Sequence, residues 1–142
     1  MTEPQVRELP ACTYVGERST VAMDQLAATI DAGFPRLFAR AGEPLGAPFI
    51  RYHAFDPQLD IELGVPSASG EAEFASGEYV MATHFGAYEE LVGVHAALQA
   101  WLAERGLSSA DAIELYQTDP RAEPDVSKWV TEVGYRIVRA RP

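Results

Sequence analysis

Apolar residues recur along this chain with two different periods, one typical of helices and one typical of strands. Residues 21–41 and 89–105 have the helical period, and each of these stretches is followed by a glycine, which commonly ends a helix. The two apolar stripes consist of Leu26, Ile30, Phe34, Leu37 and Phe38, and of Leu91, Val94, Leu98, Trp101 and Leu102. The pattern therefore predicts two long amphipathic helices.

Six shorter segments alternate with a period of two and are rich in β-branched and aromatic residues, as strands are. They are residues 5–15, 49–55, 59–65, 78–85, 112–117 and 129–137. In chain order the elements read strand, helix, strand, strand, and then the same again. A stretch rich in Pro, Ser, Ala, Gly and Glu at 66–76 separates the two halves and is predicted to be a linker. We expect a single domain over residues 1–142, with repeats over about 5–65 and about 77–139.

Individual residues repeat along with the elements. Three residues of the first half recur in the second at an offset of 70, namely Gly16, Glu62 and Gly64 as Gly86, Glu132 and Gly134. Tyr52 and Tyr116 are each followed by an Asp-Pro turn. These matches predict an α+β fold of two pseudo-symmetric repeats, which form one antiparallel sheet with both long helices on one face.

The strand at 129–137 contains the feature that points to a function. Glu132 and Gly134 share one face of it, and the alternate residues form an apolar face that we expect to pack against a helix. Glu62 and Gly64 have the same relationship in the first repeat. A glycine beside a carboxylate leaves an open patch of sheet. We therefore predict a ligand cleft between the repeats, on the face away from the helices.

Composition restricts the classes of function. The formal charge of −10 argues against nucleic-acid binding, which needs a basic surface. No apolar run approaches the roughly 20 residues of a membrane span, and the lone Cys12 forms no disulfide framework. The three histidines lack the spacing of a metal site, so no metal or other cofactor is expected. The default location for such a chain is the cytoplasm.

Four pieces of the second half resemble a known family. They are His84-Phe-Gly-Ala-Tyr88, Trp101, Glu114-Leu-Tyr-Gln-Thr-Asp-Pro120 and Thr131-Glu-Val-Gly-Tyr135. The family is the GyrI-like small-molecule-binding domain, which also serves as the effector-binding half of AraC- and MerR-type multidrug-responsive regulators. This chain departs from the family pattern at Arg136, where proline is common, and at His95, where an aromatic residue is frequent. It begins without a helix-turn-helix segment, and we therefore expect the stand-alone version.

The resemblance implies a cleft for hydrophobic, cationic aromatic molecules, with Glu132 complementing the charge of the ligand. Six further residues are candidates to line the cleft, namely Tyr116, Glu62, Tyr52, Gly134, Trp129 and Trp101. Purely structural roles remain open for three of these residues: Glu132 as a charged residue on an edge strand, Glu62 as a solvated residue, and Trp101 as a core residue. Arg136 shares the face of Glu132 and is a candidate to neutralise it.

The sequence is consistent with three functions. The first is a sensor or sequestering protein that binds small molecules. The second is a hydrolase for reactive natural products that uses the same glutamate. The third is a protein-binding role like that of gyrase inhibitors, with a protein partner or a second copy of the chain bound.

Overall fold

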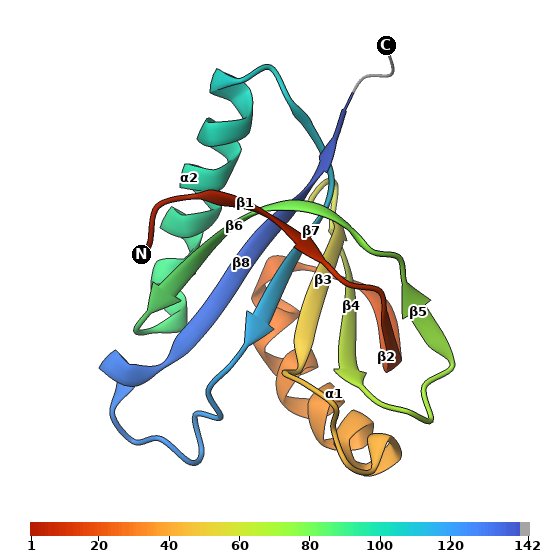
Figure 1. The fold of residues 1–142 in the computed structure, drawn as a ribbon. Helices are drawn as coiled ribbons and strands as arrows, with labels where there is room; N and C mark the ends of the chain where they lie inside the picture. Colours follow the sequence, from red (N-terminus) through yellow and green to blue (C-terminus); the bar gives the residue numbers. More distant parts are fainter. Residues whose placement is uncertain (140–142) are drawn as a thin grey trace. The chain divides into compact units, whose positions relative to one another are not determined.

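The computed structural model describes residues 1–139 (Figure 1). The chain forms two compact units. One unit is continuous and spans residues 10–76. The other combines residues 1–9 with the chain from residue 77 onward. Each unit is an antiparallel sheet with one long helix, so the predicted α+β class with two long helices is confirmed. Residues 140–142 of the predicted domain lie outside the described residues.

The unit of residues 10–76 places its helix over its central strands. Its strand order is β3-β4-β2-β5, and α1 contacts β2 and β4. Gly33 of α1 lets the helix approach the sheet, because a β-carbon there would collide with Leu63. The elements are β2 (Cys12–Val21), the short helix η1 (Met23–Gln25), α1 (Leu26–Ala41), β3 (Phe49–Ala54), β4 (Leu59–Pro66) and β5 (Ala72–Phe74).

The second unit has the strand order β1-β6-β8-β7, with α2 against β6, β7 and β8. The buried residues of α2 are spaced three or four apart, as the sequence predicts, and are Leu91, Val94, Leu98 and Leu102. The elements are β1 (Gln5–Leu9), β6 (Gly77–Phe85), η2 (Tyr88–Glu90), α2 (Leu91–Glu104), β7 (Ser108–Tyr116), η3 (Val126–Lys128) and β8 (Val130–Val138).

The predicted strand at 5–15 is in fact two strands that belong to different units. Pro10 and Ala11 separate them, and proline lacks the N–H that a continuous ladder needs. β1 pairs with β6, and β2 pairs with β4 and β5. The predicted linker at 66–76 is also partly ordered, because it contains β5. Both the division of residues 5–15 into two strands and the strand within 66–76 depend on pairing with strands that are distant in the sequence.

The helix-facing side of each sheet agrees with the period-two pattern. Leu63 of β4 meets α1 at Gly33, and the hydroxyl of Tyr135 on β8 meets α2 at His95.

The predicted match of Gly16 with Gly86 between the two repeats does not hold. Gly16 lies inside β2 opposite Gly64, whereas Gly86 follows β6 with a φ of 125°.

Two absences apply to residues 1–139. None of their helices combines the length and the apolar character that a membrane crossing needs. Within the same range, His, Cys, Asp and Glu side chains do not gather in a group of three that could hold a metal ion.

Candidate functional site

Glu114 is a buried carboxylate on the α2 side of its sheet. It lies opposite Val133 in the β7–β8 ladder, so both side chains share the face that α2 covers. Only 5% of Glu114 is exposed. One carboxylate oxygen lies 2.6 Å from Nε2 of His95, and the other accepts a hydrogen bond of 2.6 Å from the hydroxyl of Tyr116. A buried charge is costly unless it is paired, so this pairing is what keeps Glu114 in place.

His95 connects Glu114 to a second hydroxyl. Its Nδ1 lies 2.7 Å from the hydroxyl oxygen of Tyr135, and the side-chain amide of Gln99 donates to the same oxygen at 3.1 Å. Burial raises the pKa of Tyr135 to about 12, so this phenol stays protonated at neutral pH. Glu114, His95, Tyr135 and Gln99 thus form one chain of hydrogen bonds between the sheet and α2.

Aromatic rings extend the site beyond Tyr116. The ring of Tyr88 lies edge-on to Tyr116 at 5.7 Å and packs against Trp129 at 5.0 Å. The indole of Trp129 donates to the carbonyl of Glu123 at 2.8 Å, which fixes its orientation. Burial, with lesser effects of nearby carboxylates, raises the pKa of Tyr88. All three rings are partly exposed, so a carboxylate lies just behind an aromatic rim.

Glu132 lies on the opposite face of the same sheet. Its carboxylate is 3.3 Å from the guanidinium of Arg7 and accepts a hydrogen bond of 3.3 Å from Gln117. Arg136, the candidate to neutralise Glu132, instead donates to the buried Asp111 at 3.2 Å and lies over the ring of Tyr79. The cation beside Glu132 is therefore Arg7, which comes from the distant strand β1.

Gly134 does not provide the open patch that the sequence suggests. It is buried, and a β-carbon at this position would collide with the sulfur of Met81 on β6. Gly64 is covered in the same way by the ring of Phe49. In both units the glycine makes room for a neighbouring side chain, so the prediction of an open patch is wrong.

Glu62 also has a complete set of partners. It accepts a hydrogen bond of 2.8 Å from Tyr14, lies 2.9 Å from Nε2 of His53, and has the guanidinium of Arg51 at 3.7 Å. These side chains lie on the face away from α1, because Arg51 is opposite Glu62 and Leu63 faces the helix. Like Glu132, Glu62 has a permanent cation beside it.

The remaining candidates lie in different surroundings. Tyr52 is opposite Ile61, on the α1 side of its sheet, and stacks on Phe55 at 5.1 Å. Trp101 is partly exposed, and the guanidinium of Arg105 covers its ring at 4.0 Å. Of the residues predicted from sequence, only Tyr116 and Trp129 belong to the aromatic group around Glu114.

Sequence reasoning missed Glu114 itself, together with His95 and Tyr88. Residues 111–114 of β7 are buried on both faces, so the apolar Ile113 and Leu115 did not reveal which face of the strand meets the helix. The available signal was a charged residue in the middle of a strand that is otherwise buried. Such a residue needs a partner, and only the folded chain identifies it as His95.

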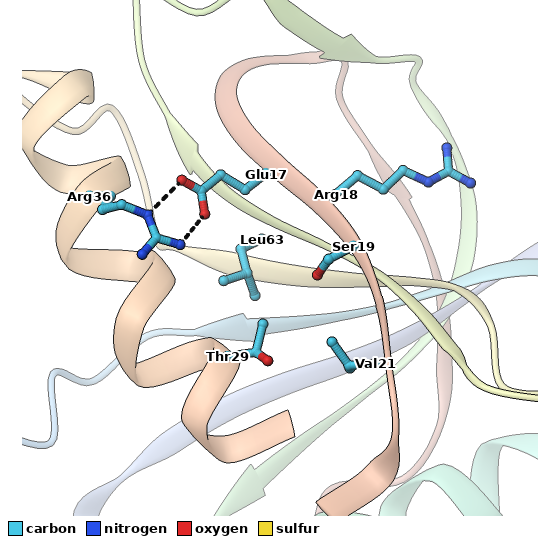
Figure 2. A pocket seen from close by; sticks show the side chains of 7 residues that line it. All are labelled: Glu17, Arg18, Ser19, Val21, Thr29, Arg36 and Leu63. Atoms are coloured by element: carbon cyan, nitrogen blue, oxygen red, sulfur yellow. Dashed lines mark hydrogen bonds and ion pairs between the residues drawn. The ribbon is translucent and has the colours of Figure 1, made fainter. Parts of the chain in front are cut away.

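Hollows also lie at the surface away from Glu114. Figure 2 shows one in the unit of residues 10–76, between β2 and α1, with a volume of about 460 Å³. Arg36 closes one wall through two hydrogen bonds to Glu17, of 3.0 and 2.8 Å, while Arg18 points away from Leu63 (Figure 2). The hollow is open, and its charges are already paired. It is lined by Glu17, Arg18, Ser19, Val21, Thr29, Arg36 and Leu63.

Comparison with known proteins agrees with the fold. A family model described as the GyrI-like small molecule binding domain matches residues 2–138. No curated protein sequence matches the chain. The crystal structure of the EcmrR C-terminal domain is 17% identical with a TM-score of 0.82, and the match covers 97% of this chain and 98% of that one. In the EcmrR–DNA complex in EcmrR-RPo, at 16% identity and a TM-score of 0.82, the match covers 97% of this chain but only 58% of EcmrR.

Two further structures resemble this chain. SAV2435 bound to tetraphenylphosphonium is 18% identical with a TM-score of 0.70, and the match covers 96% of this chain and 94% of that one. A hydrolase from Listeria innocua is 14% identical with a TM-score of 0.58, with 96% and 92% covered. At these identities the likeness concerns the fold.

Proposed function

The chain belongs to the GyrI-like small-molecule-binding domain family, and we propose that it binds hydrophobic aromatic cations with Glu114 as the ligand's counter-charge. In this proposal the protein acts as a sensor or as a sequestering protein. Glu132, which the sequence favours, is the competing candidate for the same role.

The observation that carries this proposal is the difference between three carboxylates. Glu132 lies beside Arg7 and Glu62 beside Arg51, so the charge of each is offset by a permanent cation. The hydrogen-bond partners of Glu114 within residues 1–139 are His95 and Tyr116, and neither is permanently charged. A buried carboxylate with only such partners gains most from a cation that arrives from outside.

The rings beside Glu114 favour the same kind of ligand. Tyr88, Tyr116 and Trp129 present partly exposed aromatic faces, and a cation over such a ring gains about 0.5–2 kcal/mol. Apolar contact adds about 25 cal/mol for each Å² that is removed from water. The similar protein SAV2435 was solved with tetraphenylphosphonium, a cation of this class. These terms favour hydrophobic cations without strict selection of shape.

Calorimetric titration tests the proposal with tetraphenylphosphonium and with triphenylphosphine oxide, a neutral aromatic analogue. We expect the cation to bind more tightly than the neutral molecule. Glu114→Gln should weaken cation binding at least about tenfold, equivalent to about 1.4 kcal/mol, and affect the neutral analogue less. Glu132→Gln is the matched control and should change cation affinity by less than about threefold, since Arg7 already compensates that charge. The reverse ranking of the two variants would favour Glu132 instead.

One observation supports a hydrolase as the second candidate. Glu114 lies 2.6 Å from His95, and a carboxylate in such a site can act as a general base towards water that enters with the substrate. The test is to incubate the protein with a reactive aromatic epoxide and to follow diol formation by chromatography. Turnover that Glu114→Gln abolishes would support the enzyme. Saturable binding without product would support the binding protein.

A further inference from the structure

His95 occupies the position of an internal counter-ion to Glu114. Its Nε2 lies 2.6 Å from one carboxylate oxygen, while the second oxygen is bonded to Tyr116. The imidazole side chain is 15% exposed and that of Glu114 is 6% exposed, so the pair is largely shielded from water. Histidine is the side chain whose charge ordinarily changes near neutral pH. The charge that offsets Glu114 is therefore one that can be removed.

The hydrogen-bond chain accepts both charge states of His95. With neutral His95, the amide of Gln99 donates to Tyr135, the hydroxyl of Tyr135 donates to Nδ1, and Nε2–H donates to Glu114. With protonated His95, Nδ1–H donates to Tyr135, whose hydroxyl then donates to the carbonyl oxygen of Gln99 after its amide turns by half a rotation. Each state keeps the same number of hydrogen bonds. Protonation of His95 therefore changes the net charge of the Glu114–His95 pair without breaking the network.

Titratable groups from each neighbouring element face His95 or its end of α2. β7 contributes Glu114 and Tyr116, and β8 contributes Tyr135. β6 contributes His84, whose Nε2 lies 3.0 Å from the carbonyl of Ala87 and 3.8 Å from Glu90 of η2. Tyr88 of η2 completes the set through its contact with Tyr116. Among these groups His95 is the one in direct contact with the Glu114 carboxylate that can supply a positive charge.

We infer that His95 is the specificity-determining residue of this site, because a cationic ligand and a proton on His95 compete for the negative charge of Glu114. This inference rests on the proposed function at Glu114. Protonated His95 neutralises the carboxylate and repels a second cation, whereas neutral His95 leaves the negative charge available. Binding of a permanent cation is thus coupled to release of a proton in mildly acidic solution. A neutral aromatic ligand gains nothing from that exchange.

Isothermal titration of the full chain with tetraphenylphosphonium tests the inference. The two pH values are about 5.5 and about 7.5, on either side of the range in which histidine ordinarily changes charge. Wild-type affinity should be lower at pH 5.5 than at pH 7.5 by more than about threefold, because ligand binding that releases a proton weakens as the pH falls. At the lower pH, buffers with different ionisation enthalpies should report the release of up to about one proton. The affinity of His95→Gln should change by less than about threefold over the same range, because glutamine keeps a hydrogen bond and has no proton to release. Triphenylphosphine oxide should show no loss of affinity at the lower pH.

A matched control uses the second buried histidine of this unit. His84→Gln should keep the pH dependence of the wild type, since His84 contacts Ala87 and not Glu114. If His84→Gln rather than His95→Gln abolishes the dependence, the inference is overturned. The NMR signals of the His95 ring in the wild-type protein provide a readout that needs no variant. Addition of tetraphenylphosphonium at pH 6 should move them towards the neutral form, and unmoved signals would overturn the inference.

The two proposals fail in different ways. Tetraphenylphosphonium that binds with equal affinity at both values of pH, without proton release, overturns the exchange and leaves the proposed function intact. Tetraphenylphosphonium that binds neither the wild type nor His95→Gln at either pH overturns both.

Discussion

Tyr116 and Glu132 lie on opposite faces of one sheet. Tyr116 is opposite Thr131 in the β7–β8 ladder, and Leu115 is opposite Glu132. Tyr116 therefore faces α2 together with Glu114, while Glu132 faces the side on which Arg7 and Met81 lie. A molecule that lies against one face of this sheet therefore meets one of these side chains, and the other is on the far side. This geometry separates the two candidate carboxylates and makes them independently testable.

The phenol and the ring of Tyr116 should have separable effects on ligand binding. Tyr116→Phe keeps the ring and removes the 2.6 Å hydrogen bond to Glu114, so affinity for tetraphenylphosphonium should be unchanged or slightly higher. Tyr116→Ala removes the aromatic face and should weaken binding about tenfold, given a cation–π energy of about 0.5–2 kcal/mol. Fluorescence or calorimetric titration measures both. Equal losses in the two variants would mean that the hydroxyl, not the ring, contacts the ligand.

Gly134 should be intolerant of a larger side chain for a structural reason. Gly134→Ala places a β-carbon against the sulfur of Met81 and should lower the free energy of unfolding by about 1–3 kcal/mol. Shortening the neighbour in the double variant Gly134→Ala/Met81→Ala should relieve the collision, so the two changes should be less than additive. Urea denaturation measures each variant. Gly93→Ala is the control, because nothing lies within 4 Å of its β-carbon and alanine favours a helix.

Two arginines near the same strand should differ in their effect on stability. Arg136 donates to Asp111, whose side chain is 9% exposed, and Arg136→Gln leaves that carboxylate without this partner. The loss should be about 1–3 kcal/mol. Arg7 is 42% exposed where it meets Glu132, and Arg7→Gln should cost less than about 1 kcal/mol. Urea denaturation at low and high salt distinguishes the two. A larger loss for Arg7→Gln would contradict the assignment of partners.

Alkaline pH should destabilise the fold through two buried tyrosines. Burial is the main reason that the pKa values of Tyr135 and Tyr14 rise from 10.0 to about 12. Between these values the unfolded chain loses protons that the folded chain keeps, so this contribution is complete below about pH 10 and is lost as the pH rises towards about 12. Phenylalanine has no such proton. The difference in the free energy of unfolding between wild type and Tyr135→Phe should therefore shrink from about pH 9 to about pH 11, on either side of the ordinary tyrosine pKa. Urea denaturation measures it, and a constant difference would refute this account.

Local pattern was sufficient for the elements and for part of their orientation. The apolar stripe of α2 and the helix-facing side of β8 both follow from spacing, because a helix or a strand presents its residues at a set period. The fold class follows from the order of these elements. The family resemblance also came from local motifs, since residues 84–88 and 114–120 are contiguous in the chain.

Contacts between distant residues could not be derived in this way. That Arg7 rather than Arg136 meets Glu132 depends on the pairing of β1 with β6, which joins residues about 70 positions apart. The cover of Gly134 by Met81 and the meeting of His95 with Glu114 depend on strand register and on the seating of α2. Period and propensity describe each element alone, whereas the state of a charge depends on what other elements bring beside it. Tertiary packing therefore decided that Glu114 lies beside His95, whereas Glu132 lies beside the permanent cation of Arg7.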